Sequence, residues 1–386
     1  MSTGVAADEL VASPELFRAG LHEWLECGNA DEWRHSHAET ASQSLTENGR
    51  LVALLFESGW GRYGWPVEAG GLGGTELHLG ILYDELSRRG IPVPEQYGVL
   101  QVLGPMVVRF APHLAEQYLA PFLRGEEWWG QGFSEPEAGS DLASLRTKAI
   151  RDGDTYRISG SKLWTSHGVG AARMVVLART GTPESRHRGL SMFLVDSDAP
   201  GLEIRPIALS NGREELAEVF YDDVVVGADR LIGEEDGGWG AAMYLMQYER
   251  GLWAWLRSTA LLRRLGELAE LVDATTEGAD AVMGNAYLDV AGLRARAGAT
   301  VRRLAAGDVI GPEASSDKLM LGRAEFAVQD SARELLGTRF LFEPALREWR
   351  DEWWFSRTTT IYGGSAEVQR QILADQVLKL PKEANR

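Results

Sequence analysis

The spacing of apolar residues changes at one stretch of the chain: Gln131-Gly132-Phe133-Ser134-Glu135-Pro136-Glu137-Ala138-Gly139-Ser140-Asp141. Before it, residues 8 to about 126 carry apolar side chains at helical spacing, and Thr75 is placed to cap one of these helices. After it, the chain up to about residue 232 forms short apolar runs separated by turn signals, such as the hairpin signal Asp152-Gly153. From Gly237-Gly238 onward the helical pattern returns. The stretch therefore opens a β-rich segment that lies between two helical ones.

The β-rich segment shows no alternation of strands with helices, which argues against a parallel Rossmann sheet and favours a small antiparallel barrel or sandwich. Its last two strands are expected at 219–221 and 224–226. The final segment predicts helices at about 238–272, 278–306, 314–339 and 364–378. Long helices with short connections favour an antiparallel bundle. The predicted fold class is α+β multidomain, with an N-terminal helical domain (1–126), a middle antiparallel β-barrel-like domain (127–235) and a C-terminal four-helix bundle (236–386).

The composition narrows the classes of partner. The chain has 386 residues and a formal net charge of −17, which argues against binding to nucleic acid or to an anionic membrane face. Cys27 is the only cysteine, so an intrachain disulfide or a cysteine-rich metal site is excluded and a reducing compartment is favoured. The N-terminus lacks the features of a signal peptide, and no apolar run approaches the roughly 20 residues of a membrane span. We expect a soluble cytoplasmic protein without a metal centre, in which a few local groups still suffice to bind a phosphorylated ligand.

Two segments around the β-rich region carry groups suited to a planar ligand. In residues 131–141, exposed backbone N–H groups and the hydroxyls of Ser134 and Ser140 can bind flavin carbonyls or a phosphate, although an ordinary polar turn would give the same pattern. In residues 162–168, alternation places Trp164 and Ser166 on one face of an extended segment, as a flat wall beside a hydroxyl. The alternative is that Trp164 belongs to the core and Ser166 begins a turn.

A third segment joins a loop to a helix: Tyr362-Gly363-Gly364-Ser365-Ala366-Glu367-Val368-Gln369-Arg370. Ser365 is placed as the N-cap, and the two glycines before it would let a ligand approach bare backbone at the helix N-terminus. A plain loop-to-helix junction is the alternative.

Glu249 stands out on the first helix of the final segment because it falls within an apolar stripe. The stripe consists of Ala242, Leu245, Met246, Leu252, Trp253 and Leu256. A carboxylate there costs several kcal/mol by desolvation unless a partner or a role holds it, and burial would raise its pKa toward that of a general base at neutral pH. The alternative is a structural ion pair with an arginine, although Arg250 is a poor partner because adjacent helical residues point about 100° apart.

In this order and on this plan, the three segments resemble the acyl-CoA dehydrogenase family. The resemblance also covers Gly59-Trp60, Trp65-Pro66, His187-Arg188-Gly189-Leu190 and Asp236-Gly237-Gly238-Trp239, and so spans most of the chain. It implies FAD bound non-covalently between the β domain and the C-terminal bundle. By match, the residues that line or cover the flavin are Gln131, Phe133, Ser134, Trp164 and Ser166, with Ser166 near N5. Ser365 and Glu367 would approach the FAD of a subunit, and Ser140 would face the CoA moiety.

The resemblance implies a reaction as well: dehydrogenation of an acyl-CoA to the 2-enoyl-CoA, with a base at the α-carbon and flavin N5 as the acceptor of the β-hydride. Many members have a Glu base directly after the Tyr of the third segment, where this chain has Gly363. A subgroup resembling isovaleryl- and long-chain acyl-CoA dehydrogenases takes its base from the first bundle helix, and Glu249 matches that position. Gly363 would then leave room for Glu249, and its N–H would help bind the thioester oxygen. Tyr362 and Arg250 are expected at the substrate, with a structural role equally open for Arg250.

One departure from the family pattern bears on assembly. Many members carry an Arg-x-x-Phe-Gly run that reaches the neighbouring subunit's FAD, and none occurs between residues 257 and 318. Members that act on bulky acyl chains share this loss, and some of them work as mixed oligomers. We expect a homo- or hetero-oligomer, dimeric or tetrameric, that passes electrons to an electron-transfer flavoprotein in fatty acid or steroid side-chain metabolism. The alternatives are an acyl-CoA oxidase, a dehydrogenase of carrier-protein thioesters in a biosynthetic pathway, and a non-catalytic partner subunit.

Overall fold

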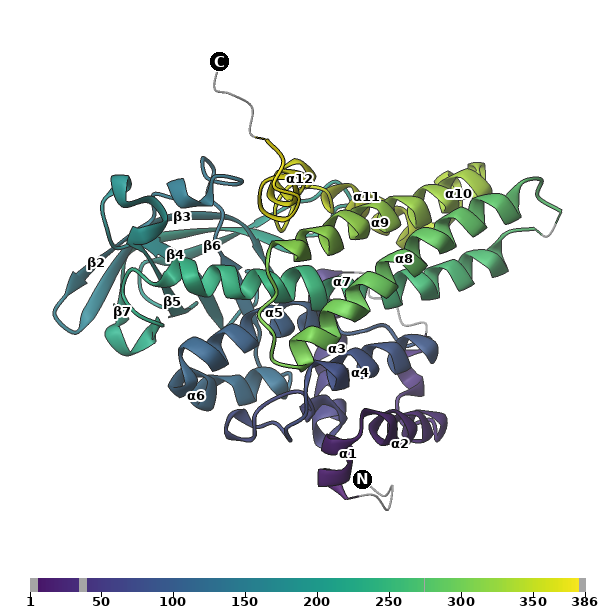
Figure 1. Cartoon of the computed structure of the whole chain (residues 1–386), viewed down its shortest axis with the longest axis horizontal. Helices are drawn as coiled ribbons and strands as arrows, with labels where there is room; N and C mark the ends of the chain where they lie inside the picture. The colour runs from purple at the N-terminus through teal and green to yellow at the C-terminus, as the bar shows by residue number, and fades with distance from the viewer. Residues whose placement is uncertain (1–5, 35–39, 274, 382–386) are drawn as a thin grey trace. The chain divides into compact units, whose positions relative to one another are not determined.

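The computed structural model describes residues 6–34, 40–273 and 275–381 (Figure 1). The chain divides into two compact units. The first unit comprises residues 1–37, 74–93 and 247–386, and the second comprises residues 38–73 and 94–246. The helical N-terminal third is therefore shared between the two units, and each unit is built from segments that are far apart in the sequence.

The first unit is helical. Its elements are α1 (Ala7–Ala12), α2 (Pro14–Glu26), η1 (Asp31–Trp33), α4 (Glu76–Arg88), the part of α7 (Gly238–Leu271) beyond residue 246, α8 (Ala279–Ala305), η7 (Pro312–Ala314), α9 (Ser315–Leu336), α10 (Thr338–Phe342), η8 (Pro344–Leu346), α11 (Arg347–Thr358), α12 (Ala366–Ile372) and the π-helical turn η9 (Leu373–Val377). The helices α7, α8, α9 and α11 share one apolar core, which includes Leu261, Leu293, Val328 and Trp349. The predicted cap of α4 is confirmed, because the Thr75 hydroxyl accepts a hydrogen bond from the Leu77 N–H at 3.3 Å.

The helix α11 is a difference from the sequence prediction. The bounds of α7, α8 and α9 lie close to those expected, but residues 337–358 were not expected to hold a helix of their own. The face that α11 buries is aromatic rather than aliphatic. The Arg264 guanidinium lies 4.0 Å from the ring centroid of Trp349, and that of Arg357 lies 4.7 Å from the ring of Trp353. Cation–π contacts of this kind stabilise the packing of α11, although its sequence is rich in charged residues.

The second unit combines helices with one sheet. Its elements are α3 (Ala41–Glu57), η2 (Trp60–Arg62), η3 (Val67–Ala69), α5 (Glu95–Phe110), α6 (Pro112–Leu123), β1 (Trp129–Gly132), η4 (Leu142–Ser144), β2 (Lys148–Asp152), β3 (Thr155–Ser166), β4 (Arg173–Arg179), η5 (Pro183–Gly189), β5 (Leu190–Asp196), β6 (Leu202–Ile207), β7 (Leu216–Gly227), η6 (Ala228–Arg230) and β8 (Leu231–Ile232). Hydrogen bonds order the strands β6-β7-β3-β2-β4-β5-β8, with β1 beside β4. The strands β1 and β2 pair with β4 in parallel, whereas the other pairs are antiparallel. The predicted hairpin is confirmed, since Asp152 pairs with Thr155.

The strand β7 was expected as two strands and is one. Between the pairs Ile158–Val224 and Gly160–Tyr221 the register shifts by one residue, and Asp223 has a φ of +55°. An extra residue in a β-bulge bends a strand without ending its pairing. The two adjacent Asp residues, Asp222 and Asp223, therefore read as a turn in the sequence but are absorbed as a bulge in the sheet.

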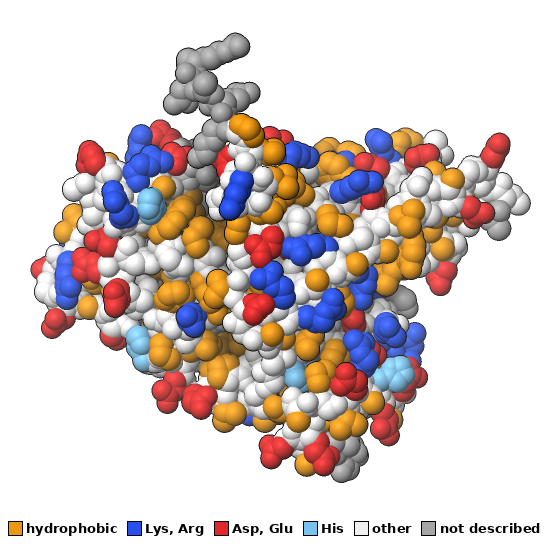
Figure 2. Space-filling model, in the orientation of Figure 1, with side chains coloured by type: hydrophobic (Ala, Val, Ile, Leu, Met, Phe, Trp, Pro, Cys, Tyr) orange, Lys and Arg blue, Asp and Glu red, His pale blue; other side chains and the backbone are white. Residues whose placement is uncertain are grey.

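The surface mixes both signs of charge. On the face drawn in Figure 2, acidic and basic side chains are interspersed with apolar ones. Among the described residues, no helix is both long enough and apolar enough to cross a membrane. Within the same residues, no group of three or more His, Cys, Asp or Glu side chains is arranged to hold a metal ion.

Candidate active site

Glu249 lies on α7 in the first unit, half-buried beside side chains that are fully buried, such as Leu245 and Leu252. The approach of α7 to α8 is close at Gly251, where a Cβ atom would lie 2.5 Å from Thr300 Cγ2. Glu249 lies two residues before this contact on α7. The stripe predicted from the sequence is thus buried, and Glu249 belongs to it.

The carboxylate of Glu249 lies against Gly363. A Cβ atom placed on Gly363 would overlap Glu249 Oε1, and the same position is 3.5 Å from Lys318 Cε. A Cβ atom on Gly364 would overlap Gln369 Nε2 and lie 4.0 Å from Arg250 Nη2. The φ angles of Gly363 and Gly364 are +63° and +92°, which also favour glycine. Polar residues from α7, α9 and α12 thus border the space that side chains at Gly363 and Gly364 would fill. The structure brings Glu249 and Gly363 together.

Arg250 and Gln369 have polar atoms that lack partners. Gln369 is 0% exposed, and neither its amide oxygen nor its amide nitrogen has a hydrogen-bond partner. The Nε of Arg250 is likewise buried without one. Burial lowers the pKa of Arg250, and the charge of Glu249 opposes this shift. Buried polar groups in proteins nearly always have partners, so these atoms beside the diglycine mark a place suited to a polar ligand.

Lys318 was missed by the sequence reasoning. It lies on α9 and is 4% exposed, and its ammonium donates to the Thr359 carbonyl at 2.7 Å. The same nitrogen lies 3.6 Å from the ring centroid of Tyr362. Burial lowers the pKa of Lys318 to about 7, against the opposing charges of Glu249 and Glu325. The signal was present, because Lys318 falls on the same helical face as Leu321, as Glu249 does on its own stripe.

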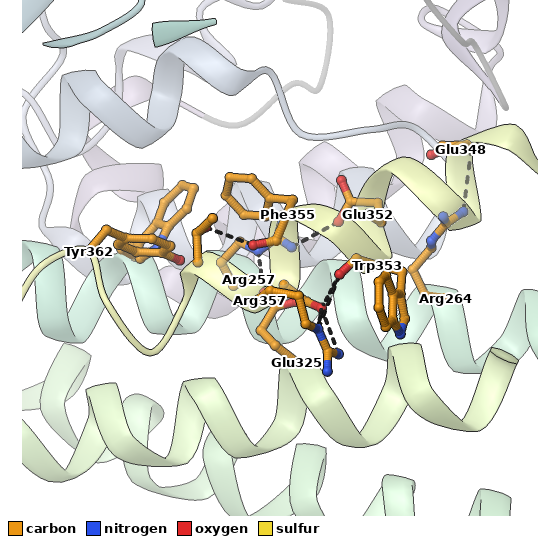
Figure 3. A network of polar contacts seen from close by, with 12 residues as sticks. Arg257, Arg264, Glu325, Glu348, Glu352, Trp353, Phe355, Arg357 and Tyr362 are labelled. Carbon is orange, nitrogen blue, oxygen red and sulfur yellow. Dashed lines mark hydrogen bonds and ion pairs between the residues drawn. The ribbon is translucent and has the colours of Figure 1, made fainter. Parts of the chain in front are cut away.

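Tyr362 lies at one end of a polar network (Figure 3). Its hydroxyl accepts a hydrogen bond from Trp253 Nε1 at 3.2 Å, and burial raises its pKa to about 12. The guanidinium of Arg257 donates to Glu325 at 2.6 Å and to Glu352 at 3.0 Å. These contacts hold the segment that leads into the diglycine.

Ser365 caps α12 as predicted, since its hydroxyl accepts from the Val368 N–H at 3.3 Å. Glu367, in the first turn of that helix, is exposed and lies 3.7 Å from Arg370. A loop-to-helix junction is therefore present, and the unpartnered amide of Gln369 lies on its helix.

In the second unit, the structure brings together the first two segments. The Leu163 N–H donates to the Ser134 carbonyl at 2.9 Å. The ammonium of Lys162 donates to the Phe133 carbonyl at 3.0 Å and to Glu135 Oε1 at 2.8 Å. Burial lowers the pKa of Lys162 to about 8, with Glu135 opposing the shift. Gln131 is half-buried at β1, Phe133 is buried and Ser140 is exposed. The turn is thus fixed to β3 beside Trp164.

Trp164 is not a core residue. It is 53% exposed and has a φ of +62°, at a bulge where the register of β3 and β7 shifts between Lys162 and Thr165. Thr165 is fully buried and Ser166 is half-buried, but Lys162 is buried as well, so the bulge at Trp164 interrupts the alternation that the sequence predicted. A bulky residue in this conformation costs about 1–3 kcal/mol, and such strain gathers at functional sites.

Models of three domains of one protein family match consecutive parts of the chain. Residues 15–126 match the N-terminal domain of acyl-CoA dehydrogenase, residues 130–224 its middle domain and residues 236–378 its C-terminal domain. The chain belongs to the acyl-CoA dehydrogenase family. It is therefore an oxidoreductase that acts on acyl-CoA, in a family of flavoproteins.

Three similar proteins illustrate the match. The acyl-CoA dehydrogenase IpdE1 of Mycobacterium tuberculosis is 35% identical, over 96% of this chain and 98% of the relative. The ChsE4-ChsE5 complex, also from Mycobacterium tuberculosis, is a solved structure with 26% identity and a TM-score of 0.79, covering 96% of this chain and 98% of that one. The Tcur3481-Tcur3483 steroid ACAD, a second solved structure, has 26% identity and a TM-score of 0.80 over the same shares of the two chains.

Proposed function

We propose that this chain catalyses the FAD-dependent α,β-dehydrogenation of an acyl-CoA to the 2-enoyl-CoA, with Glu249 as the base that takes the α-proton. One observation carries the proposal: Glu249 Oε1 occupies the space that a side chain at position 363 would fill. A carboxylate that arrives from α7 thus stands where the family's common base would project. The same observation argues against a non-catalytic partner subunit, which would need no carboxylate there.

The other residues of the first unit fit the needs of this step. The Gly363 N–H would polarise the thioester carbonyl and stabilise the charge that develops as the α-proton leaves. Arg250 and Tyr362 would bind substrate beside it, and the unpartnered amide of Gln369 supplies a further polar group. Ser365 and Glu367 would approach the FAD of a subunit.

The residues of the second unit fit a flavin. An exposed indole held at a strained bulge offers a flat wall, and the hydroxyls of Ser134 and Ser166 lie on the two segments that meet there. Gln131, Phe133, Ser134, Trp164 and Ser166 would hold the ring, and Ser140 would face the CoA. When bound, the flavin supplies the two-electron acceptor for the hydrogen that leaves the β-carbon.

The wider proposal concerns the substrate and the assembly. The name of the steroid ACAD among the similar structures supports a bulky acyl chain, and the ChsE4-ChsE5 complex supports an oligomer of more than one kind of chain. An electron-transfer flavoprotein would take the electrons in the cytoplasm. We also propose the division into domains 1–126, 127–235 and 236–386, which the ranges of the three family matches support.

The test is anaerobic bleaching of the flavin by a panel of short, branched, aromatic and steroid-derived acyl-CoAs. Glu249→Gln is expected to slow bleaching by about 100-fold or more, because it removes the base. Glu270→Gln, an exposed change on the same helix, is the matched control and should leave the rate unchanged. Bleaching that survives Glu249→Gln would show that the base is another residue. Oxygen consumption without an added acceptor would instead indicate an oxidase.

A further inference from the structure

Lys318 is a buried lysine whose direct contacts are neutral and whose side chain is an ammonium below its pKa of about 7. Its ammonium touches the Thr359 carbonyl at 2.7 Å and the face of the Tyr362 ring at 3.6 Å. A buried ammonium is costly unless an anion compensates it. The anions whose charges act on Lys318 are Glu249 and Glu325.

Glu325 already has a cationic partner. Arg257 donates to it at 2.6 Å and also to Glu352 at 3.0 Å, in the network of Figure 3. Tyr362, which lies over Lys318, carries no charge at neutral pH because burial raises its pKa to about 12. Of the two anions, Glu249 therefore has the larger influence on the charge of Lys318.

The geometry agrees with this charge balance. The space above Gly363 is bounded by Glu249 Oε1 and by Lys318 Cε, which lies 3.5 Å from the position of a Cβ atom there. The charged and titratable groups near Glu249 include Arg250 on its own helix, Lys318 and Glu325 on α9, and Tyr362 on the segment before the diglycine. Lys318 is the cation among them that lies against the same glycine as the carboxylate.

We propose that Lys318 is a positioning residue for Glu249, whose ammonium keeps that carboxylate ionised and held at Gly363 between turnovers. The proposal rests on Glu249 as the base. Lys318 exchanges no proton with the substrate: Glu249 takes the α-proton, and Lys318 keeps its own.

The first test is the pH profile of anaerobic flavin bleaching in Lys318→Met, a change that keeps the length and apolar body of the side chain. Loss of a nearby cation should raise the apparent pKa of the base by about one unit or more. The rate should then fall about tenfold on the acidic side of the profile and recover at higher pH. Arg323→Met removes a cation from the same helix whose side chain is 76% exposed, and it should not move the profile. An unchanged profile in Lys318→Met would overturn the proposal.

A second test uses thermal unfolding and needs no activity. Glu249→Gln, Lys318→Met and the double variant form a cycle with the parent chain. Glu249→Gln should lower Tm more in the presence of Lys318 than in its absence, because it leaves the ammonium without its anion. Equal changes in the two backgrounds would contradict the coupling. If Glu249→Gln leaves bleaching intact, the proposed base fails; if it abolishes bleaching and only the Lys318 tests are negative, the base stands and the positioning role is wrong.

Discussion

Gly363 in the first unit and Trp164 in the second have nearly the same backbone angle, with φ values of +63° and +62°. At Gly363 a side chain is excluded, because its first atom would overlap the Glu249 carboxylate. At Trp164 one of the largest side chains occupies a conformation that glycine would adopt at lower cost, and it is 53% exposed. A positive φ alone therefore does not identify the role of a residue. What matters is whether the position must be empty or must be filled.

Gly363→Ala should give the largest effect. The new Cβ atom would displace the Glu249 carboxylate, and a shift of about 1 Å at a reacting group can cost about 100-fold in rate. The left-handed backbone should also cost about 1–2 kcal/mol of unfolding free energy. Flavin bleaching and thermal unfolding measure the two effects.

Gly284→Ala is the matched control, since Gly284 lies on α8 with no atom within 4 Å of its Cβ position. That change should leave the rate unaltered and raise stability slightly. Similar behaviour of the two variants would remove the claim that position 363 must be empty.

Trp164→Gly should have an effect of intermediate size: it should preserve or raise the stability of the flavin-free chain and lower the affinity for flavin. Glycine relieves the strain at the bulge, so the flavin-free chain should unfold at an equal or higher temperature. The affinity for flavin should fall by about tenfold, because the flat wall is lost. Fluorescence titration with FAD and thermal unfolding of the apoprotein check this. A large drop in apoprotein stability would mean that the Trp164 side chain serves packing within the protein rather than ligand binding.

The smallest expected difference, about one pH unit in the onset of a stability change, concerns the two buried lysines. Lys162 donates directly to Glu135 and has a pKa near 8, whereas Lys318 touches neutral groups and has a pKa near 7. Both folded values lie below the unfolded value of about 10.4. Between the two values the unfolded chain binds more protons, so each lysine makes stability rise with pH.

Thermal unfolding as a function of pH tests this difference. The stability of the parent relative to Lys318→Met should begin to rise near pH 7, and that relative to Lys162→Met near pH 8. The slope should be at most about 1.4 kcal/mol per pH unit. If the relative stability begins to rise at the same pH for both variants, a direct carboxylate partner makes no difference to the pKa of a buried lysine.

The spacing of apolar residues and the order of the motifs were sufficient to predict much of the fold. The apolar stripe singled out Glu249 from the period of one helix, whereas its meeting with Gly363 was expected from the family resemblance. The alternation of residues 162–168 predicted one face for Trp164 and Ser166, but a bulge at Trp164 interrupts it, since Lys162 two residues before is buried.

Features that depend on contacts between distant segments were not predicted. Lys318 matters only because α9 packs beside residues 359–363, and nothing in its own helix gives that contact. The helix α11 was missed because arginines from other helices cover its tryptophans. The bulge of β7 was read as a turn, since two adjacent Asp residues look the same in both settings.

The division of the chain into two units has a consequence for synthesis on the ribosome. The chain passes from one unit to the other at residues 37–38, 73–74, 93–94 and 246–247. All segments of the second unit have been made once residue 246 emerges, so that unit can fold early. The helices α1, α2 and α4 must wait for residues 247–386, which take roughly ten seconds to make at about 5–20 residues per second. During this interval α4, whose residues 78–87 are all buried in the finished structure, exposes apolar surface that a chaperone would recognise.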